Sequence, residues 1–304
     1  MSNTPHLDED PTGSKRVIWN VITSWGSYVV FIVSGFIMPR MIDEFIGQVS
    51  LGIWDFCWSI VNYLTMAGIG VGSSVNRYVA KYRAANKIEE LCIAVSSVVL
   101  IQAVISFCVF AVTLVLVWTI PIFFSESLGP EVHVASYVVG FLGSSLAVQM
   151  AFDTSRGVVT GCHRWDLHNS INASSHASFT LLMIITLLLG GGLISLSVVY
   201  FIVITITCVT RMTLAHQVCP GLRVRFSYAK WSQAKKMLSF GGKSIVFGIT
   251  PLIITQTTSV MIASNLGPAA LAVFSRPLAL IRHVQTIIRK FSFVLTPMAG
   301  SIQE

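Results

Sequence analysis

Apolar residues fill most of this chain in long runs, and short polar segments separate the runs. A helix needs about 20 residues to cross the roughly 30 Å of hydrocarbon in a bilayer. Runs of that length occur at about 17–39, 52–76, 92–119, 133–156, 170–191, 194–216, 243–264 and 269–291. The pattern predicts an all-α protein, a polytopic membrane helix bundle with about eight transmembrane helices.

The eighth run carries its polar residues along one side. On an ideal helix, an arc of about 140° holds Arg276, Arg282, His283, Arg289 and Lys290. A charge at mid-bilayer costs about 2.5–3.5 kcal/mol, so a charge there usually marks a functional site. We expect Arg276 and Arg282 to face a water-filled cavity, with a paired acid as the alternative for Arg282, and Arg289 and Lys290 to lie at the membrane surface. His283 either titrates near neutral pH or serves as a polar wall residue.

The second run has a polar side of its own, within an arc of about 100°, made of Asp55, Ser59, Asn62, Ser73 and Asn76. Asp55 is predicted either to pair with Arg276 or to face water. In the fourth run, Asp153 and Arg156 share one helical face. Their spacing favours an ion pair near the membrane surface or a contact to substrate. A basic cavity suits a phosphate, because guanidinium groups form paired hydrogen bonds to its oxygens.

Composition narrows the class of protein further. Of the 304 residues, 54% are hydrophobic and 11% charged, whereas soluble domains average about 25% charged residues. The net charge of +7 is expected mainly in loops, so it does not indicate nucleic-acid binding. The six cysteines show no CxxC or other metal spacing, so we expect neither a metal site nor a cofactor. The polar, acidic first fourteen residues do not resemble a signal peptide.

Lysine and arginine gather on one set of helix ends. Lys15 and Arg16 precede the first run, Arg289 and Lys290 end the eighth, and every second loop is basic. The loops at 120–132, 190–194 and 264–268 carry no lysine or arginine, and Arg40 is the one basic residue in the remaining loop of that set. By the positive-inside rule, both termini are predicted to be cytoplasmic.

A basic segment at 220–242 divides the runs into two groups. Aromatic and basic residues recur there with helical spacing, which predicts an amphipathic helix on the inner membrane surface, with a plain basic linker as the alternative. FIGQVSLGIW at 45–54 is similar to NLGPAALAVF at 265–274, so the last two runs are predicted to repeat the first two in parallel. The expected units are a cytoplasmic tail at 1–15, a six-helix lobe at 16–219, the linker, and the first two helices of a second lobe at 243–304.

Three segments resemble the oligosaccharide-lipid flippases, a family of the multidrug/oligosaccharidyl-lipid/polysaccharide exporter superfamily. MAGIGVGSSVNRYVAKYRA at 66–84 is similar to the end of that family's second span. DTSRGVVTGCHRWDLHNSIN at 153–172 is similar to its link between spans four and five, and PRMIDEFIGQVSLGIWDF at 39–56 to its first outer loop. The resemblance covers most of residues 15–300.

The resemblance implies two six-helix lobes around a central cavity, lined largely by spans one, two, seven and eight. It implies a flippase and not an enzyme, a multi-pass protein of the bacterial inner membrane. Its substrate would be an undecaprenyl-pyrophosphate-linked oligosaccharide for surface polysaccharide such as the O-antigen of lipopolysaccharide, moved by alternating access. Its partners would be that lipid-linked oligosaccharide, the lipid bilayer and other polysaccharide-assembly membrane proteins. The candidate substrate-binding residues are Arg276, Arg282, His283, Arg156, Asp55 and Asn62.

Other functions would need other residues. A multidrug or toxin extruder of the same fold is the main alternative, and it favours acidic cavity residues and aromatic walls. A membrane glycosyltransferase or polymerase needs catalytic carboxylates at one interface or a large outer loop, whereas Glu126 and Glu131 lie in a short loop. A purely structural subunit would not need Arg282 at its depth. The resembling family usually has twelve or more spans, so the sequence also predicts a fragment or a truncated reading frame.

Overall fold

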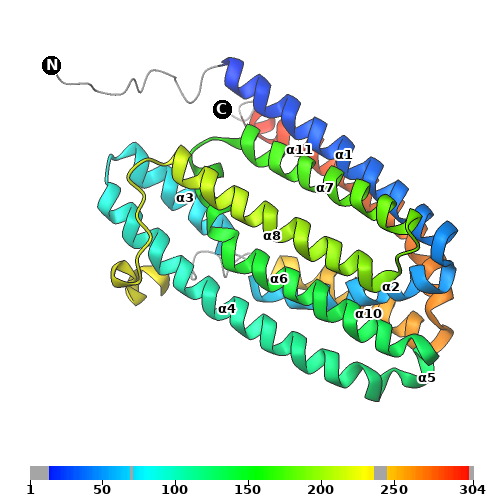
Figure 1. Cartoon of the computed structure of the whole chain (residues 1–304). Helices are drawn as coiled ribbons and strands as arrows, with labels where there is room; N and C mark the ends of the chain where they lie inside the picture. The colour runs from blue at the N-terminus through cyan, green and yellow to red at the C-terminus, as the bar shows by residue number, and fades with distance from the viewer. Residues whose placement is uncertain (1–13, 69–70, 236–244, 301–304) are drawn as a thin grey trace.

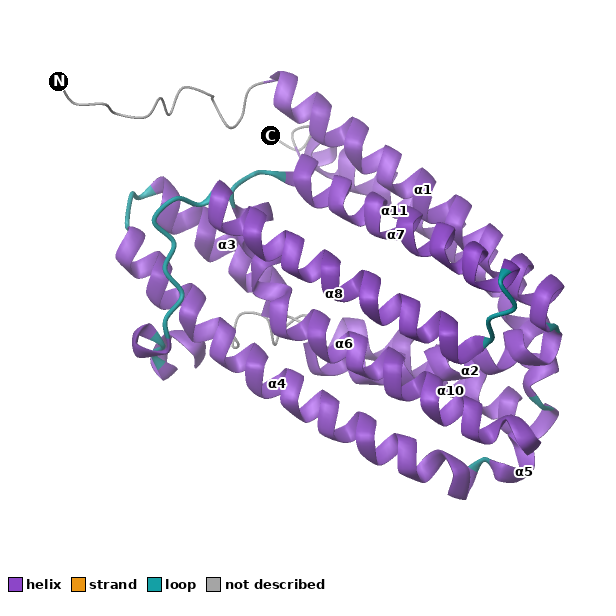
Figure 2. Ribbon diagram, in the orientation of Figure 1, coloured by secondary structure: helices purple, strands orange, loops and turns teal. Residues whose placement is uncertain are grey.

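The computed structural model describes residues 14–68, 71–235 and 245–300, and these form helices and loops without a strand. The axes of the long helices are roughly aligned, and the helices lie side by side (Figures 1 and 2). The start of α1 and the end of α11 lie at the same end of the bundle. The α-helices of the described residues are α1 (Ser14–Ile46), α2 (Gln48–Leu64), α3 (Val71–Ala84), α4 (Ile88–Phe123), α5 (Ser125–Leu128), α6 (Val132–Gly161), α7 (Trp165–Leu188), α8 (Leu193–Val218), α10 (Ile245–Leu266) and α11 (Pro268–Gly300).

The predicted fold class, an all-α bundle of membrane helices, is confirmed. Five segments of the described chain are long and apolar enough to cross a membrane, and each overlaps one predicted run: Ile18–Ile46, Ile88–Phe123, Ser125–Gly161, Trp165–Leu188 and Leu193–Val218. Helices α10 and α11 cover the seventh and eighth runs. The side of the membrane that each end faces, and the division into lobes, stay predictions.

The second predicted run is not one helix. Helix α2 ends at Leu64, a 3-10 turn follows at Thr65–Gly68, and α3 begins at Val71. The turn lies in MAGIGVG, where glycine recurs at every second position and each glycine costs a helix about 1 kcal/mol. The polar side predicted for this run is therefore divided, with Asp55, Ser59 and Asn62 on α2 and Asn76 on α3.

The linker is not the continuous amphipathic helix that the spacing predicts. Arg225 has extended backbone angles, a 3-10 turn covers Phe226–Tyr228, and helix appears at 231–235. Residues 236–242 of the predicted helix lie outside the described part of the chain. Backbone N–H groups of the linker bond to side chains of α4 instead of closing helical turns.

The two segments that resemble each other fold into the same turn. Gly47 joins α1 to α2 with φ +88°, and Gly267 joins α10 to α11 with φ +86°. Leu51 N–H donates to the Gly47 carbonyl at 3.1 Å, and Leu271 N–H to the Gly267 carbonyl at 3.4 Å. Both leucines are buried. Glycine is needed in both turns because residues with a Cβ rarely adopt positive φ.

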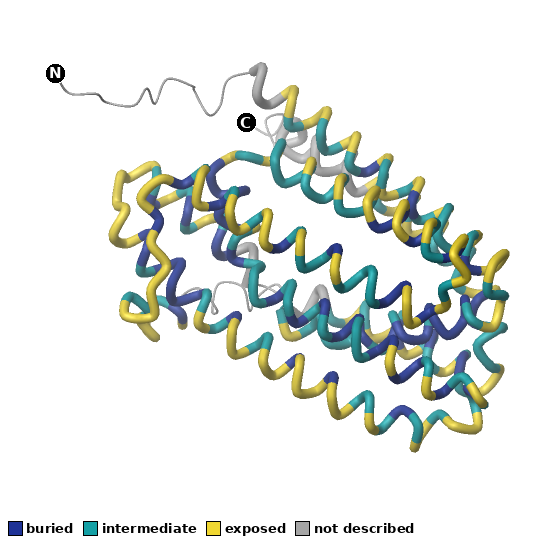
Figure 3. The backbone as a smooth tube through the Cα atoms, viewed as in Figure 1, coloured by how far each residue is buried: buried dark blue, intermediate teal, exposed yellow. Residues whose placement is uncertain are grey.

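Buried apolar side chains form two large clusters. Figure 3 marks the buried positions along the backbone in dark blue. One lies among α2, α6, α7 and α8, where Leu271 and Ala272 of α11 join it. The other lies among α3, α4, α6 and α8, near the end of the bundle where the linker runs. Helices α10 and α11 pack mainly on α2. Where α2 meets the start of α11, a Cβ on Gly52 would lie 1.8 Å from the Pro268 carbonyl oxygen. Because glycine has no Cβ, the backbones of the two helices can touch there.

Candidate functional site

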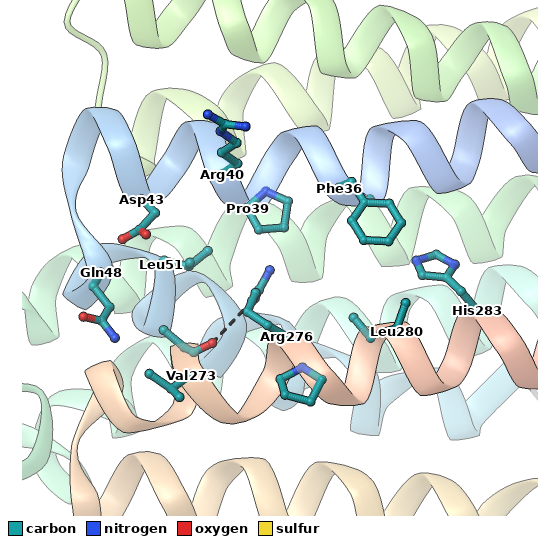
Figure 4. A pocket seen from close by; sticks show the side chains of 14 residues that line it. Phe36, Pro39, Arg40, Asp43, Gln48, Leu51, Val273, Arg276, Leu280 and His283 are labelled. Carbon is teal, nitrogen blue, oxygen red and sulfur yellow. Dashed lines mark hydrogen bonds between the residues drawn. The ribbon is translucent and has the colours of Figure 1, made fainter.

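A pocket of about 570 Å³ lies between α1 and α11. Figure 4 shows Phe36 and Arg40 of α1 on one side, with Arg276, Leu280 and His283 of α11 on the other. Asp43 and Gln48 lie at one end of the pocket, beside the Gly47 turn. The pocket thus brings together two of the six predicted substrate-binding residues, Arg276 and His283.

The first of these, Arg276, is already paired with a carboxylate of the protein. Its guanidinium forms an ion pair with Asp55, and Ser275 Oγ donates a hydrogen bond to the same carboxylate oxygen. The guanidinium also donates to Ser275 Oγ at 3.0 Å and to the Ala272 carbonyl at 3.3 Å. Of the two alternatives for Asp55, the ion pair with Arg276 is confirmed. The pair leaves this part of the pocket nearly neutral.

His283 is held by aromatic side chains of α1. Its ring stacks on Phe36 with centroids 5.8 Å apart and meets Phe31 edge-on at 5.7 Å. Tyr28 Oη donates to the His283 carbonyl oxygen at 2.8 Å. A Cβ on Gly35 would lie 3.2 Å from the ring nitrogen Nε2. The ring therefore forms part of a packed contact between α1 and α11.

Arg282 lies on a different side of α11. It is exposed, and it does not line the pocket between α1 and α11. Residues seven apart share a helical face, so Arg282 lies on the side of Ser275, which bonds to Asp55 of α2. Its charge attracts Asp55, but no carboxylate in the described residues lies within ion-pair distance of it. The Arg282 guanidinium is therefore a cation on the α2-facing side of α11. The carboxylate of Asp55, which attracts it, is already paired with Arg276.

Asn62 belongs to the same side of the bundle. Ser275 contacts Asp55 with a separation of 220 residues, and the same separation places Asn62 at the depth of Arg282. The Asn62 side chain is half-buried. It lines neither the pocket between α1 and α11 nor the second pocket described next.

Arg156 lies in a second pocket, of about 290 Å³, near the break between α2 and α3. Its Nε is 3.0 Å from Asp153 Oδ1, so the predicted ion pair within α6 is present. Thr65, Gly68 and Leu252 line the same pocket. The structure thus does not gather the six predicted residues at one point. It places Arg276, His283 and Asp55 together and Arg156 apart. The side chains of Arg289 and Lys290 lie outside the described part.

Several polar contacts were not predicted. Gln102 Oε1 is buried in α4 and accepts a hydrogen bond from Thr154 N–H of α6 at 2.8 Å. Arg211 of α8 donates to Asn172 Oδ1 of α7 at 2.8 Å. Such pairs come from different helices, so helical periodicity carries no signal for them. Gln102 is a polar residue within an apolar run, and its polarity alone could have marked it as a residue with a polar partner.

The family model described as MatE matches residues 24–177, slightly more than half of the chain. The match begins in α1 and ends in α7. No curated protein and no solved structure matches this chain.

Proposed function

Because the chain belongs to the MatE family, and is thus a multi-pass membrane transporter, we propose that it is a flippase for a lipid-linked oligosaccharide. The substrate would be linked through undecaprenyl pyrophosphate and carried across the bacterial inner membrane for surface polysaccharide. The observation that carries this proposal is Arg282. It is a cation on the α2-facing side of α11 without a carboxylate at ion-pair distance in the described residues.

A pyrophosphate is the chemical group that such a cation suits. A guanidinium binds phosphate oxygens through paired hydrogen bonds, and no carboxylate in the described residues lies at ion-pair distance from Arg282. Arg156 would be a weaker contact, because Asp153 already neutralises it. Asn62, at the depth of Arg282, would supply an amide for the sugar or the phosphate.

Alternating access would use the contact between α2 and α11. Gly52 touches Pro268 there, and Asp55 binds Ser275 and Arg276. These contacts hold the two helices together near the Gly47 and Gly267 turns. For the substrate to leave on that side, α2 and α11 would separate and Asp55 would release Arg276.

One observation favours a second function, extrusion of cationic drugs. The pocket between α1 and α11 holds the exposed carboxylate of Asp43, and its wall includes the rings of Phe36 and His283. An acid and an aromatic wall suit an organic cation. The two functions differ in which residue the activity depends on, Arg282 for the flippase and Asp43 for the extruder.

Complementation of a flippase-null strain tests the proposal. We expect Arg282→Ala to reduce surface polysaccharide to the background level and Arg282→Lys to restore part of it. Lys87→Ala removes an exposed charge that pairs with Glu90, and we expect it to change nothing. Immunoblots of the membrane fraction confirm equal amounts of each variant. Normal polysaccharide with Arg282→Ala would overturn the proposal, and a loss of toxin resistance on Asp43→Asn would favour the extruder.

A further inference from the structure

The segment that follows α8 runs back along α4 as a strap, defined here as residues 221–235. Three of its backbone N–H groups bond to α4 side chains. Arg223 donates to Cys92 Sγ at 3.2 Å, Arg225 to Ser96 Oγ at 3.2 Å and Lys230 to Ser97 Oγ at 2.9 Å. The strap is therefore fixed along about one and a half turns of α4, and its first residues, 222–225, are not helical.

Two apolar side chains of the strap line a pocket, of which Leu222 is buried and Val224 is 38% exposed. Leu222 and Val224 line a pocket of about 240 Å³ between α4, α6 and α8. Arg223 and Arg225, on the other side of the extended backbone, are exposed. The pocket is mostly apolar, with Val95, Phe152, Val158 and Met212 in its wall. An apolar pocket thus opens beside two arginines.

Three polar side chains in the wall of this pocket already have hydrogen-bond partners within the protein. Ser155 Oγ donates to the Phe152 carbonyl, and His216 Nδ1 bonds to the Met212 carbonyl. Thr154 Oγ1 donates to Gln102 Oε1. A ligand in the pocket would therefore find an apolar wall, and its polar part would have to lie outside, at the arginines.

The strap lies at the depth of a lipid headgroup. Trp118 is 73% exposed near the other end of α4, as expected for an aromatic residue at a membrane interface. Ser97 lies about 31 Å from Trp118 along α4, at 1.5 Å per residue. That distance equals the thickness of the hydrocarbon layer, so the strap lies where the opposite headgroups begin.

The exposed surface of the strap is basic and aromatic. Phe226 is 76% exposed and Trp231 73% exposed. Arg223, Arg225, Lys230 and Lys235 are exposed as well. No carboxylate in the described part of the chain forms an ion pair with any of these four cations. Exposed aromatic rings and unpaired cations at this depth are typical of a surface that binds anionic lipid.

We propose that the strap and the pocket behind it form a binding site for one anionic phospholipid. The lipid phosphate binds Arg223 and Arg225, and one acyl chain enters the pocket lined by Leu222 and Val224. Phe226 and Trp231 lie in the interface on either side. The proposal does not depend on the proposed flippase activity, because the site is built from the strap, α4, α6 and α8 and does not include Arg282. By the positive-inside rule this lipid belongs to the cytoplasmic leaflet.

The test uses the full chain in phosphatidylcholine nanodiscs with increasing phosphatidylglycerol. Native mass spectrometry counts the phosphatidylglycerol that stays bound after release from the disc. We expect one retained molecule, and about tenfold weaker retention for the double variant Arg223→Gln/Arg225→Gln. Val224→Trp changes no charge but fills the pocket, and we expect a similar loss. If it lowers the melting temperature in pure phosphatidylcholine, Val224→Phe takes its place.

The control double variant Lys81→Gln/Lys87→Gln removes two exposed charges from the same end of the bundle. We expect it to retain phosphatidylglycerol within about twofold of the original chain. An equal loss in both double variants would mean diffuse attraction and would overturn the site. Unchanged retention in the Arg223/Arg225 variant, unchanged retention in the pocket variant, or equal retention of phosphatidylcholine would overturn it as well.

Discussion

Asp55 and Ser275 are hydrogen-bonded to each other, and they occupy equivalent positions in the two segments that repeat with a separation of 220 residues. A residue can touch its own counterpart only close to the axis that relates two copies. Parallel repeats in transporters are related by an axis along the membrane normal. For the predicted parallel repeat, the contact of Asp55 with Ser275 would place this axis between α2 and α11, where a transport pathway between two repeats would run.

The ion pair of Asp55 and Arg276 is expected to stabilise the contact between α2 and α11. The two side chains are 20% and 34% exposed, so a double-mutant cycle with Asp55→Ala and Arg276→Ala should give a coupling of about 1–2 kcal/mol, less than for a fully buried pair. The measurement is thermal unfolding in detergent. The same cycle on Arg40 and Glu44, which are 78% and 51% exposed, should give less than about 0.5 kcal/mol. Equal couplings would contradict the prediction.

Gly52→Ala should separate α2 from α11. The new Cβ would lie 1.8 Å from a backbone oxygen of Pro268, so one backbone has to move, at a cost of about 1–3 kcal/mol. The melting temperature should fall by several degrees. Gly26→Ala in α1 is the control, since no atom lies within 4 Å of its Cβ position and alanine favours helix. A drop of the same size in both variants would show that the contact with Pro268 is not the cause.

The two glycine turns should respond alike to substitution. Gly47 has φ +88° and ψ +163°, a region that only glycine adopts without strain, and Gly267 has φ +86°. Nothing lies within 4 Å of either Cβ position, so backbone strain is the whole cost. Gly47→Ala and Gly267→Ala should each destabilise the chain by about 1–3 kcal/mol in thermal unfolding. A large difference between them would show that the two turns are not equivalent.

Cys162, between α6 and α7, should react as a thiolate near neutral pH. A hydrogen bond from Cys219 and the charges of Arg83 and Arg164 lower its pKa to about 7, although burial opposes them. Alkylation of its peptide, followed by mass spectrometry, should therefore rise with a midpoint near pH 7. Arg83→Gln should raise the midpoint, whereas Lys81→Gln on the same helix should not. An unchanged midpoint with Arg83→Gln would contradict this.

The same pKa makes a prediction about stability. Because the pKa of Cys162 is below the ordinary 9.0 of a thiol, its thiolate stabilises the folded chain. That stabilisation is complete above about pH 9 and is lost as the pH falls through about 7. Cys162→Ser should remove this part of the pH dependence of the melting temperature. A pH profile unchanged by the substitution would count against it.

Most of the helices could be predicted from the sequence, because an apolar run of bilayer length has few other structures open to it. The break after Leu64 was missed because the run stays apolar across it, so hydropathy has no minimum there. The linker was predicted as a helix from its spacing. Its N–H groups instead found acceptors on Cys92, Ser96 and Ser97, which lie about 130 residues away in the sequence.

The candidate site was predictable only in part. Charge in an apolar run singled out Arg276, and for Asp55 two alternatives were left open, pairing with Arg276 or facing water. Helical geometry cannot show which side of one helix faces another. It therefore grouped Arg282 with His283, whereas the structure places Arg282 outside the pocket that His283 lines. Tyr28 and Ser275 carry no charge, and only their contacts reveal them.

Helix α4 also has a consequence for the choice of membrane. Its 36 residues form a stiff rod, and the exposed Trp118 and the strap at Ser97 mark two levels on it that cannot move relative to each other. A bilayer thicker or thinner than that spacing would have to deform or tilt the protein, at a cost of fractions of a kcal/mol per Å of mismatch. The chain is therefore expected to prefer membranes whose hydrocarbon thickness matches that spacing.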